Sequence, residues 1–212
     1  MSMPVTKSEA ESISIRLETP KDYRETEVMV REAFWDVYKP GCDEHLIIHK
    51  LRDSAAFIKG LDFVACDSNR IVGAVICPKA KIEDEKSQEF TVLSLIVAVL
   101  PSYQKRGIGS RLVKRAMDDA RSLGFKGIVI FGSPEYYLRF GFMNAKEYGI
   151  QTSEGENFDA FMALQLSEHS LDRIRGRFYE DDAYHPGKDE LEAFEKGFPY
   201  KEKHVTDTQL KM

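Results

Sequence analysis

The most informative pattern in the chain reads Val97-Ala-Val-Leu-Pro-Ser-Tyr-Gln-Lys-Arg-Gly-Ile-Gly-Ser110. Its apolar beginning predicts the end of a buried strand, Pro101 lies in the following turn, and a helix opens after Gln104. The first turn of a helix has backbone N–H groups without intrahelical partners, and the helix dipole adds positive charge there. Glycine at 107 and 109 removes side chains from that surface, so a phosphate can approach the backbone closely.

Basic residues are concentrated around the same turn. Residues 105–115 contain no acidic side chain and the basic residues Lys105, Arg106, Arg111, Lys114 and Arg115. The 212-residue chain has a formal net charge of −5, so this cationic patch indicates a small anionic ligand rather than nucleic acid. A solvated helix face is the alternative interpretation. The Gly-x-x-x-x-Gly-Lys-Ser/Thr loop and the six-position dinucleotide fingerprint are both absent from the sequence.

Hydrophobic periodicity places this turn inside a strand–helix–strand unit. Residues 90–99 are apolar on both faces, which predicts a strand in the centre of a sheet. Residues 106–123 predict a helix with one apolar stripe, ended by Gly124, and residues 127–131 predict another apolar strand. A helical crossover between the two strands makes them parallel. Elsewhere we predict strands at 12–17, 62–66, 71–78, 142–151, 159–166 and 175–180, and helices at 22–38, 43–51, 133–140 and 189–196.

The combined pattern resembles the acyl-CoA-binding motif of the GNAT superfamily of N-acetyltransferases, Gln/Arg-x-x-Gly-x-Gly/Ala. Members of that family read apolar-Ala-Val-x-Pro-x-Tyr-Gln before the glycines and Tyr-x-x-apolar-Gly-Phe after the next strand. Here these motifs are residues 97–104 and Tyr137-Leu-Arg-Phe-Gly-Phe142. The resemblance covers residues 12–166 in outline and 95–142 in motif detail. We therefore expect a flexible tail at 1–11, a GNAT-type domain at 12–166, and a C-terminal extension at 167–212 packed on or near it.

The resemblance implies a mixed α/β fold whose central sheet, flanked by helices, splays open between strands 90–99 and 127–131. Acetyl-CoA, the implied co-substrate, would lie in that gap. Its pantetheine arm would bond to the backbone of Val97, Ala98 and Val99. Its pyrophosphate would lie on the amides of Lys105, Arg106, Gly107, Ile108, Gly109 and Ser110. Independently of the family, a broken pair of parallel strands leaves unpaired backbone groups in the sheet centre, and these need such a partner.

The chemistry implied by the resemblance is direct attack of a primary amine on the thioester, without a covalent enzyme intermediate. A backbone N–H near Val97 is the expected donor to the thioester oxygen as it becomes negative. Tyr137 matches the family position of the acid that protonates the departing thiolate; a core tyrosine in an aromatic-rich helix is the alternative. Family members often carry a Glu inside one of the two central strands, but residues 90–99 and 127–131 contain no carboxylate. The base is therefore open between Glu89, a water held by Ser94, and other ordered water.

The acceptor site would be walled by the helices at 22–38 and 43–54. A cationic amine would be tolerated by the acidic side chains expected in the nearby loops, which are Asp36, Asp43, Glu44, Glu83, Asp84 and Glu85. Two other functions stay open. The fold could hold acyl-CoA as a sensor without turnover, which the missing strand carboxylate favours. Alternatively, the helix terminus at Gly107 could bind a nucleotide or another phosphate ligand.

The remaining sequence features concern metal binding, cellular compartment and binding partners. His45 and His49 have a metal-ligand spacing on one helix, but we prefer amphipathic packing and expect no metal. Three cysteines without metal or redox spacing, and no apolar run of the ~20 residues that a bilayer requires, predict a cytoplasmic protein without a membrane segment. Acetyl-CoA and an unidentified amine are the expected partners, a homodimer is allowed for, and nucleic acid is not expected.

Overall fold

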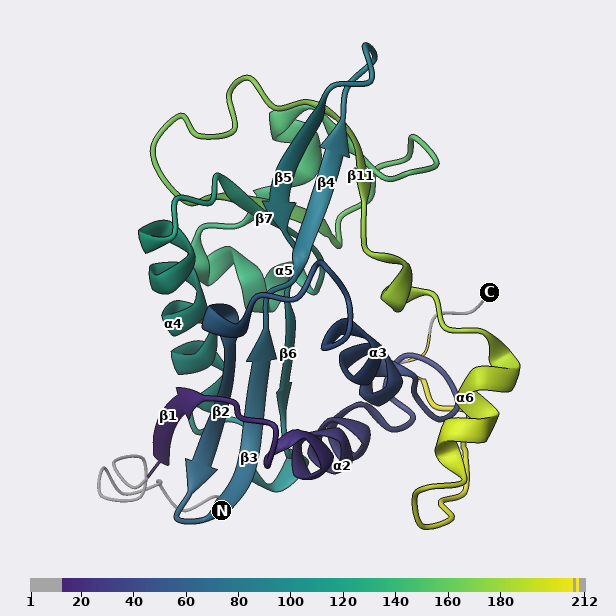
Figure 1. The fold of residues 1–212 in the computed structure, drawn as a ribbon. Coiled ribbons are helices and arrows are strands. Elements are labelled where there is room, and N and C mark those ends of the chain that lie inside the picture. The colour runs from purple at the N-terminus through teal and green to yellow at the C-terminus, as the bar shows by residue number, and fades with distance from the viewer. Residues whose placement is uncertain (1–12, 208, 210–212) are drawn as a thin grey trace.

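The computed structural model describes residues 13–207 and 209, so the tail predicted at 1–11 lies outside the described residues. The strands form two sheets, one above the other in Figure 1. In spatial order the first sheet contains β1 (Ile13–Leu17), β2 (Asp62–Asp67), β3 (Arg70–Ile76) and β6 (Ile96–Val99). The second contains β8 (Met143–Asn144), β10 (Phe161–Gln165), β7 (Gly127–Phe131), β5 (Glu89–Leu93), β4 (Lys79–Glu83), β11 (Gly176–Tyr179) and β9 (Ile150–Gln151).

The first sheet is antiparallel throughout and ends at β6. Along the β3–β6 ladder, Gly73 lies opposite Val99 and Ile76 lies opposite Ile96. The other edge of β6 pairs with no strand among the described residues. An unpaired strand edge therefore lies in the middle of the molecule, where the first sheet adjoins the second.

The second sheet is mixed. Strand β5 runs antiparallel to β4 and parallel to β7, with Leu93 opposite Ile128. Strands β10 and β11 are antiparallel to β7 and β4. The parallel relation predicted for the two strands that flank the crossover helix is therefore confirmed.

The prediction of one continuous strand over residues 90–99 is wrong. The segment forms β5 and β6, which belong to different sheets, with Ser94 and Leu95 between them. Ser94 N donates to the carbonyl of Pro78 at 3.0 Å in the register of the β4–β5 ladder, but Pro78 has no N–H with which to return the bond, and the ladder ends there. The Ser94 hydroxyl bonds to Tyr184 at 2.6 Å. We call residues 94–95 the strand break. The predicted opening of the sheet begins there, because β6 leaves the sheet that contains β7.

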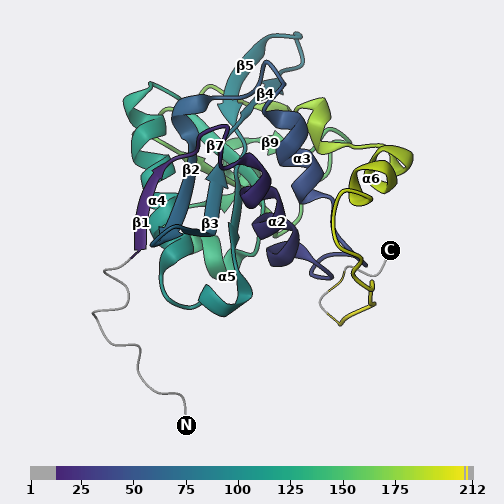
Figure 2. The ribbon, with the colours of Figure 1, turned by 60° about the horizontal axis from the view of Figure 1, so that its bottom comes forward.

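Helices cover both faces of the first sheet: α2 packs on β3 and β6 from one side and α4 packs on β2, β3 and β6 from the other (Figure 2). The helices are α2 (Tyr23–Phe34), α3 (Glu44–Leu51), α4 (Ile108–Ser122), α5 (Pro134–Tyr137) and α6 (Lys188–Glu195). The short 3-10 helices are η1 (Lys59–Leu61), η2 (Pro101–Tyr103), η3 (Leu138–Phe140), η4 (Ala145–Tyr148) and η5 (Asp182–Tyr184). Within the part of the chain described, no helix combines the length and apolarity needed to cross a membrane.

Two helix boundaries differ from the prediction because of left-handed backbone. Helix α2 ends at Phe34 rather than near residue 38, and Asp36 then adopts a φ of 61°. Helix α4 begins at Ile108 rather than 106, because Lys105 and Gly107 have φ values of 62° and 80°. Left-handed residues cannot continue a right-handed helix, so the turn before α4 is longer than the sequence pattern suggested.

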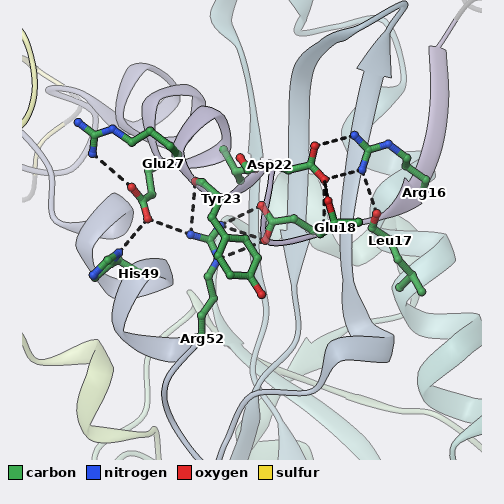
Figure 3. Close-up of polar contacts among 11 residues, drawn as sticks. Arg16, Leu17, Glu18, Asp22, Tyr23, Glu27, His49 and Arg52 are labelled. Carbon is green, nitrogen blue, oxygen red and sulfur yellow. Dashed lines mark hydrogen bonds and ion pairs between the residues drawn. The ribbon is translucent and has the colours of Figure 1, made fainter.

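A buried charged network ties β1, α2 and α3 together (Figure 3). Arg52, just after α3, donates to Glu18 at 2.9 Å and to Glu27 at 3.0 Å. All three side chains are nearly fully buried, with 4%, 0% and 6% exposed. His49 Nδ1 lies 2.9 Å from Glu27 Oε1. The network fixes α2 and α3 against the first sheet, and these helices flank the opening between the sheets.

The C-terminal residues pack along α2 and α3. Arg31 of α2 pairs with Glu195 of α6 at 2.8 Å. The His45 ring lies 5.4 Å and 5.0 Å from the rings of Phe194 and Phe198, and His45 Nε2 lies 2.7 Å from Glu195 Oε1. The packing interpretation of His45 is therefore confirmed: burial lowers its pKa to about 4, so the ring is neutral.

Candidate active site

A cavity of about 670 Å³ lies between β6, the N-terminal end of α4 and helix α5. It is lined by Tyr38, Val97, Val99, Tyr103, Gln104, Lys105, Gly107, Ile108, Gly109, Ser110, Ser133, Tyr136, Tyr137 and Arg139. The two ends of the cavity have different chemistry, since one is formed by backbone amides and cations and the other by tyrosine rings.

The first end of the cavity is the turn before α4. Arg111 N donates to the carbonyl of Gly107 at 3.0 Å and is the first amide of the helix to be bonded in this way. In the described part of the chain, the backbone N–H groups of residues 105–110 donate no hydrogen bond to the protein. A Cβ added at Gly107 would meet nothing within 4 Å, which shows how open the turn is. Unused amides at a helix N-terminus, beside Lys105, form a site suited to an anion.

The cavity wall at β6 exposes backbone groups of alternate residues. Leu100 N donates to Val72 O across the β3–β6 ladder, and Ala98 occupies the same phase of that ladder. Successive residues of a strand direct their backbone groups to opposite edges. The N–H and C=O groups of Ala98 therefore face β3, whereas those of Val97 and Val99 face the cavity. The Val99 carbonyl accepts from the Gln104 amide, and the other three groups can bond to an extended amide-containing ligand.

The tyrosines of α5 form the other end. Tyr137 packs edge-on against Tyr136 and Phe142, with ring centroids 5.0 Å and 5.4 Å away. A side chain at Gly132 would collide with the Tyr137 ring, so this glycine makes room for the ring at the end of β7. Burial is the main cause that raises the pKa of Tyr137 well above its usual range, and the neighbouring tyrosines are a smaller one. Tyr137 therefore keeps its proton at neutral pH, and among the described residues its hydroxyl has no hydrogen-bond partner.

Most of the residues predicted to contact acetyl-CoA are brought together here, together with Tyr137. Ala98 and Arg106 are the exceptions. Ala98 is buried and turned towards β3, and the Arg106 guanidinium lies 5.0 Å from the ring of Tyr103, outside the cavity lining. Ser133 precedes α5 and makes no side-chain cap bond; its backbone carbonyl accepts from the amides of Tyr136 and Tyr137.

Six lining residues were not among the predicted contacts, and three of these connect the elements around the cavity. The Gln104 amide donates to the carbonyl of Val99 at 3.1 Å, which joins the turn to β6. Tyr136 bonds to Ser110 and lies over the start of α4. Tyr38 comes from the loop after α2. The Gln was already part of the motif, but nothing local distinguishes the two tyrosines from packing residues.

The candidate proton acceptors are distributed unevenly. Glu89 lies at the start of β5, exposed and paired with Lys81, at the end of the strand remote from the break. Glu83, Asp84 and Glu85 line a separate cavity at the tip of the β4–β5 hairpin. Of the predicted acidic residues, Glu44 lies near Tyr38, and burial raises the pKa of this carboxyl to about 7.

A family model described as Acetyltransferase (GNAT) family matches residues 27–142, more than half of the chain. The chain belongs to the GNAT family. The uncharacterized N-acetyltransferase YhbS of Escherichia coli (strain K12) is 25% identical to this GNAT chain over 162 residues, which are 76% of this chain and 92% of YhbS. The uncharacterized N-acetyltransferase YjhQ of the same strain is 28% identical over 113 residues, which are 53% of this chain and 62% of YjhQ.

Solved structures of GNAT proteins share the fold. The crystal structure of YhbS from Escherichia coli in complex with CoA gives a TM-score of 0.73 at 22% identity, over 88% of this chain and 96% of that one. A GNAT family acetyltransferase from Brucella melitensis in complex with acetyl-CoA gives a TM-score of 0.67 at 26% identity, over 81% and 97%. The predicted fold, a mixed sheet opened in its middle and flanked by helices, is therefore confirmed.

Proposed function

We propose that this GNAT protein is an acetyl-CoA-dependent N-acetyltransferase acting on a primary amine by direct attack on the thioester. The observation that carries the proposal is the continuity of two surfaces in one cavity: the free amides of residues 105–110 and the edge of β6, which is unpaired at Val97 and at the N–H of Val99. Few ligands need both an anion site and a strand-like partner. A pantetheine arm attached to a pyrophosphate needs both, and the relatives from E. coli and Brucella bind CoA and acetyl-CoA.

The residues of the cavity fit this ligand from end to end. The amides and Lys105 would hold the pyrophosphate, and Val97 and Val99 would bond to the amides of the arm. The arm would then run towards the strand break and α5. When bound, acetyl-CoA supplies an activated acetyl group. The backbone N–H of Val97 would donate to the carbonyl oxygen of that group as negative charge develops on it.

Tyr137 is proposed to donate a proton to the departing sulfur. Its hydroxyl is neutral and without a hydrogen-bond partner among the described residues, and the half-buried side chain lines the cavity, so it is available as a donor. A positioned acid of this kind typically contributes ~10²–10⁴-fold to a rate. The same neutrality excludes Tyr137 as the group that deprotonates the amine.

Binding and turnover are tested separately. Isothermal titration should show CoA and acetyl-CoA binding, and ATP should compete only weakly. Thiol release should then appear with at least one amine from a panel of spermidine, an aminoglycoside, a peptide with a free α-amine and a peptide with a free lysine. CoA binding without turnover on any of them would favour the sensor alternative. Stronger binding of ATP than of acetyl-CoA would favour the nucleotide alternative.

A further inference from the structure

The C-terminal extension reaches the strand break, the point at which the two sheets part. After β11 the chain descends towards α3 (Figure 1) and forms η5, which contacts α3. The hydroxyl of Tyr184, the last residue of η5, shares a 2.6 Å hydrogen bond with the Ser94 hydroxyl, and Ser94 is only 1% exposed. A segment outside the matched family region therefore contacts the point from which β6 diverges.

Residues 180–184 are held firmly in place. The Ser54 hydroxyl donates to Asp181 at 2.7 Å, and the other Asp181 oxygen accepts from Ala183 N at 3.0 Å. Ala183 is buried against Ile47 and Leu51 of α3. Because side chain, backbone and apolar contacts all fix this turn, its groups have defined positions beside the strand break.

Glu180 lies between β11 and this turn. In the ladders of the second sheet, Phe178 lies opposite Ile82, which in turn lies opposite Phe90 of β5. Side chains alternate along a strand, so Glu180 shares the face of Phe178. That is also the face of Val92, the second residue before Ser94. The carboxyl group is thus directed to the face of the sheet on which β5 approaches the break.

Glu180 is a partly buried carboxylate with no hydrogen bond or ion pair among the described residues. Glu18 and Glu27 differ because they pair with Arg52, and Glu195 differs because it pairs with Arg31. Glu44, whose pKa is also raised by burial, differs in accepting a hydrogen bond from Asp43 N at 3.2 Å. Burial without a compensating partner raises the pKa of Glu180 to about 7. An unpaired, partly buried carboxylate destabilises the fold, so its presence in the segment that contacts the strand break points to a function.

The other titratable groups around this segment are neutral or already hydrogen-bonded, so Glu180 is the group that can accept a proton. Tyr184 experiences the charge of Glu180, and burial raises the pKa of Tyr184 well above its usual range. Burial also raises the pKa of the Cys77 thiol well above its usual range, so that group is neutral. Asp181 is occupied by Ser54 and Ala183.

We propose that Glu180 is the general base of the acceptor site, supplied by the C-terminal extension in place of a strand carboxylate. The inference rests on the proposed transferase function. The acceptor ammonium gives one proton to the Glu180 carboxylate, directly or through one water, and Glu180 returns it to solvent. The amine nitrogen forms the N–C bond and loses its second proton to water. The C–S bond breaks as Tyr137 gives its proton to sulfur, and Tyr137 regains one from water.

The test compares the full-length wild type with Glu180→Gln, which keeps the shape of the side chain but cannot accept the proton. Thiol release is measured over the amine panel from pH 5 to 9, and CoA affinity is measured by titration. We expect Glu180→Gln to lower kcat by ~10²–10⁴-fold, with CoA affinity nearly unchanged, and to abolish the inflection of the wild-type rate near pH 7. Asp182→Asn, an exposed carboxylate of the same turn, is the matched control and should retain the wild-type profile.

A structural role for Glu180 is separated from a catalytic one by chemical rescue. Added formate should restore part of the activity of Glu180→Ala, because a small carboxylate can replace the missing base, and should not stimulate Asp182→Asn. Wild-type turnover together with an unchanged rate and pH profile in Glu180→Gln would overturn the assignment of Glu180 alone. Absence of thiol release by the wild type on every amine would instead overturn the transferase function, and the role of Glu180 with it.

Discussion

Gly109 and Tyr136 face each other at the start of α4. A Cβ at position 109 would lie 2.6 Å from the Tyr136 hydroxyl and 3.5 Å from Val99 Cγ2, so no larger residue fits without displacing a neighbour. The Tyr136 hydroxyl also bonds to Ser110. Glycine is thus required at 109 because the Tyr136 hydroxyl approaches its backbone closely. At 107 glycine suits the φ of 80°, a backbone conformation that other residues avoid.

Replacing Gly109 by Glu is expected to abolish CoA binding. The new carboxylate would be placed among the amides that we assign to the pyrophosphate, and two negative groups at one helix terminus repel each other. Isothermal titration with CoA measures the effect. Ser122→Glu adds the same charge at the other end of α4 and should leave the affinity close to that of the wild type. Unchanged CoA affinity in Gly109→Glu would contradict the placement of the pyrophosphate.

Tyr137→Phe is expected to lower kcat by ~10²-fold and to leave CoA affinity within about twofold, because the ring packing survives and only the donor is lost. The pKa of this phenol is raised by burial, so Tyr137 stays protonated beyond the usual range and adds no loss of rate below pH 10. Tyr200→Phe removes a hydroxyl from a side chain that is 93% exposed and serves as the control. A Tyr137→Phe variant with the wild-type rate would remove this group from the mechanism.

At the scale of elements, the order of strands and helices was readable from the sequence because it rests on local periodicity. Residues 108–122 carry one apolar stripe and form α4, and the apolar run at 127–131 forms β7. The glycine motif predicted the open helix terminus for the same reason, since the features that produce it are neighbours in sequence.

The strand break could not be predicted in this way. Residues 90–99 look continuous because their apolar pattern is continuous, but the ladder ends where Ser94 lies opposite Pro78, and the Ser94 hydroxyl bonds to Tyr184, which is 90 residues away. Long-range partners leave no local pattern. Glu180 was missed for a related reason, because its position follows from the pairing of β11 with β4, which is distant in sequence.

The attachment of α2 and α3 depends on Arg52. Replacing Arg52 by Met leaves Glu18 and Glu27 buried without their shared cation, and breaking such a pair costs about 3–5 kcal/mol. We expect a loss of that size in the free energy of unfolding, measured by urea denaturation. Lys59→Met removes a charge from an exposed residue nearby and should change stability by less than about 0.5 kcal/mol. A loss in Arg52→Met as small as that of the control would show that the network contributes little.

At the scale of the molecule, residues 176–204 are joined to the rest of the chain at several places. Strand β11 pairs with β4, Trp35 Nε1 donates to the carbonyl of Glu202 at 2.9 Å, and Arg31 pairs with Glu195. The acceptor side of the proposed site is therefore built from residues near both ends of the chain. The coenzyme side, in contrast, lies within residues 97–137.

The unpaired Glu180 should make the whole protein less stable as the pH rises. Its pKa is about 7 in the folded state and 4.5 ordinarily, so between these values the folded state holds a proton that the unfolded state releases. The stability present at low pH is therefore lost on going from pH 4.5 to 7. Relative to the wild type, Glu180→Gln should be more stable by about 2 to 3 kcal/mol at pH 8 and by under about 1 kcal/mol at pH 5.

Urea denaturation at the two pH values checks this expectation, with Asp182→Asn as the control that should show no such difference. A variant that loses activity while gaining stability would be typical of a residue retained for function. Equal stability of Glu180→Gln and the wild type at pH 8 would mean that the carboxylate is solvated in the folded state.

The recessed edge of β6 also bears on how the protein avoids sticking to copies of itself. Unpaired strands are templates for aggregation, and many proteins protect them with charges, prolines or covering loops. Here the unpaired edge borders a hollow of about 670 Å³, a size that suits a small molecule. A narrow, flexible ligand can enter the cavity and bond to the strand edge. We expect the elements that line the cavity to exclude a strand that belongs to another folded protein. The recess proposed to admit the coenzyme would therefore also protect the strand edge when no coenzyme is bound.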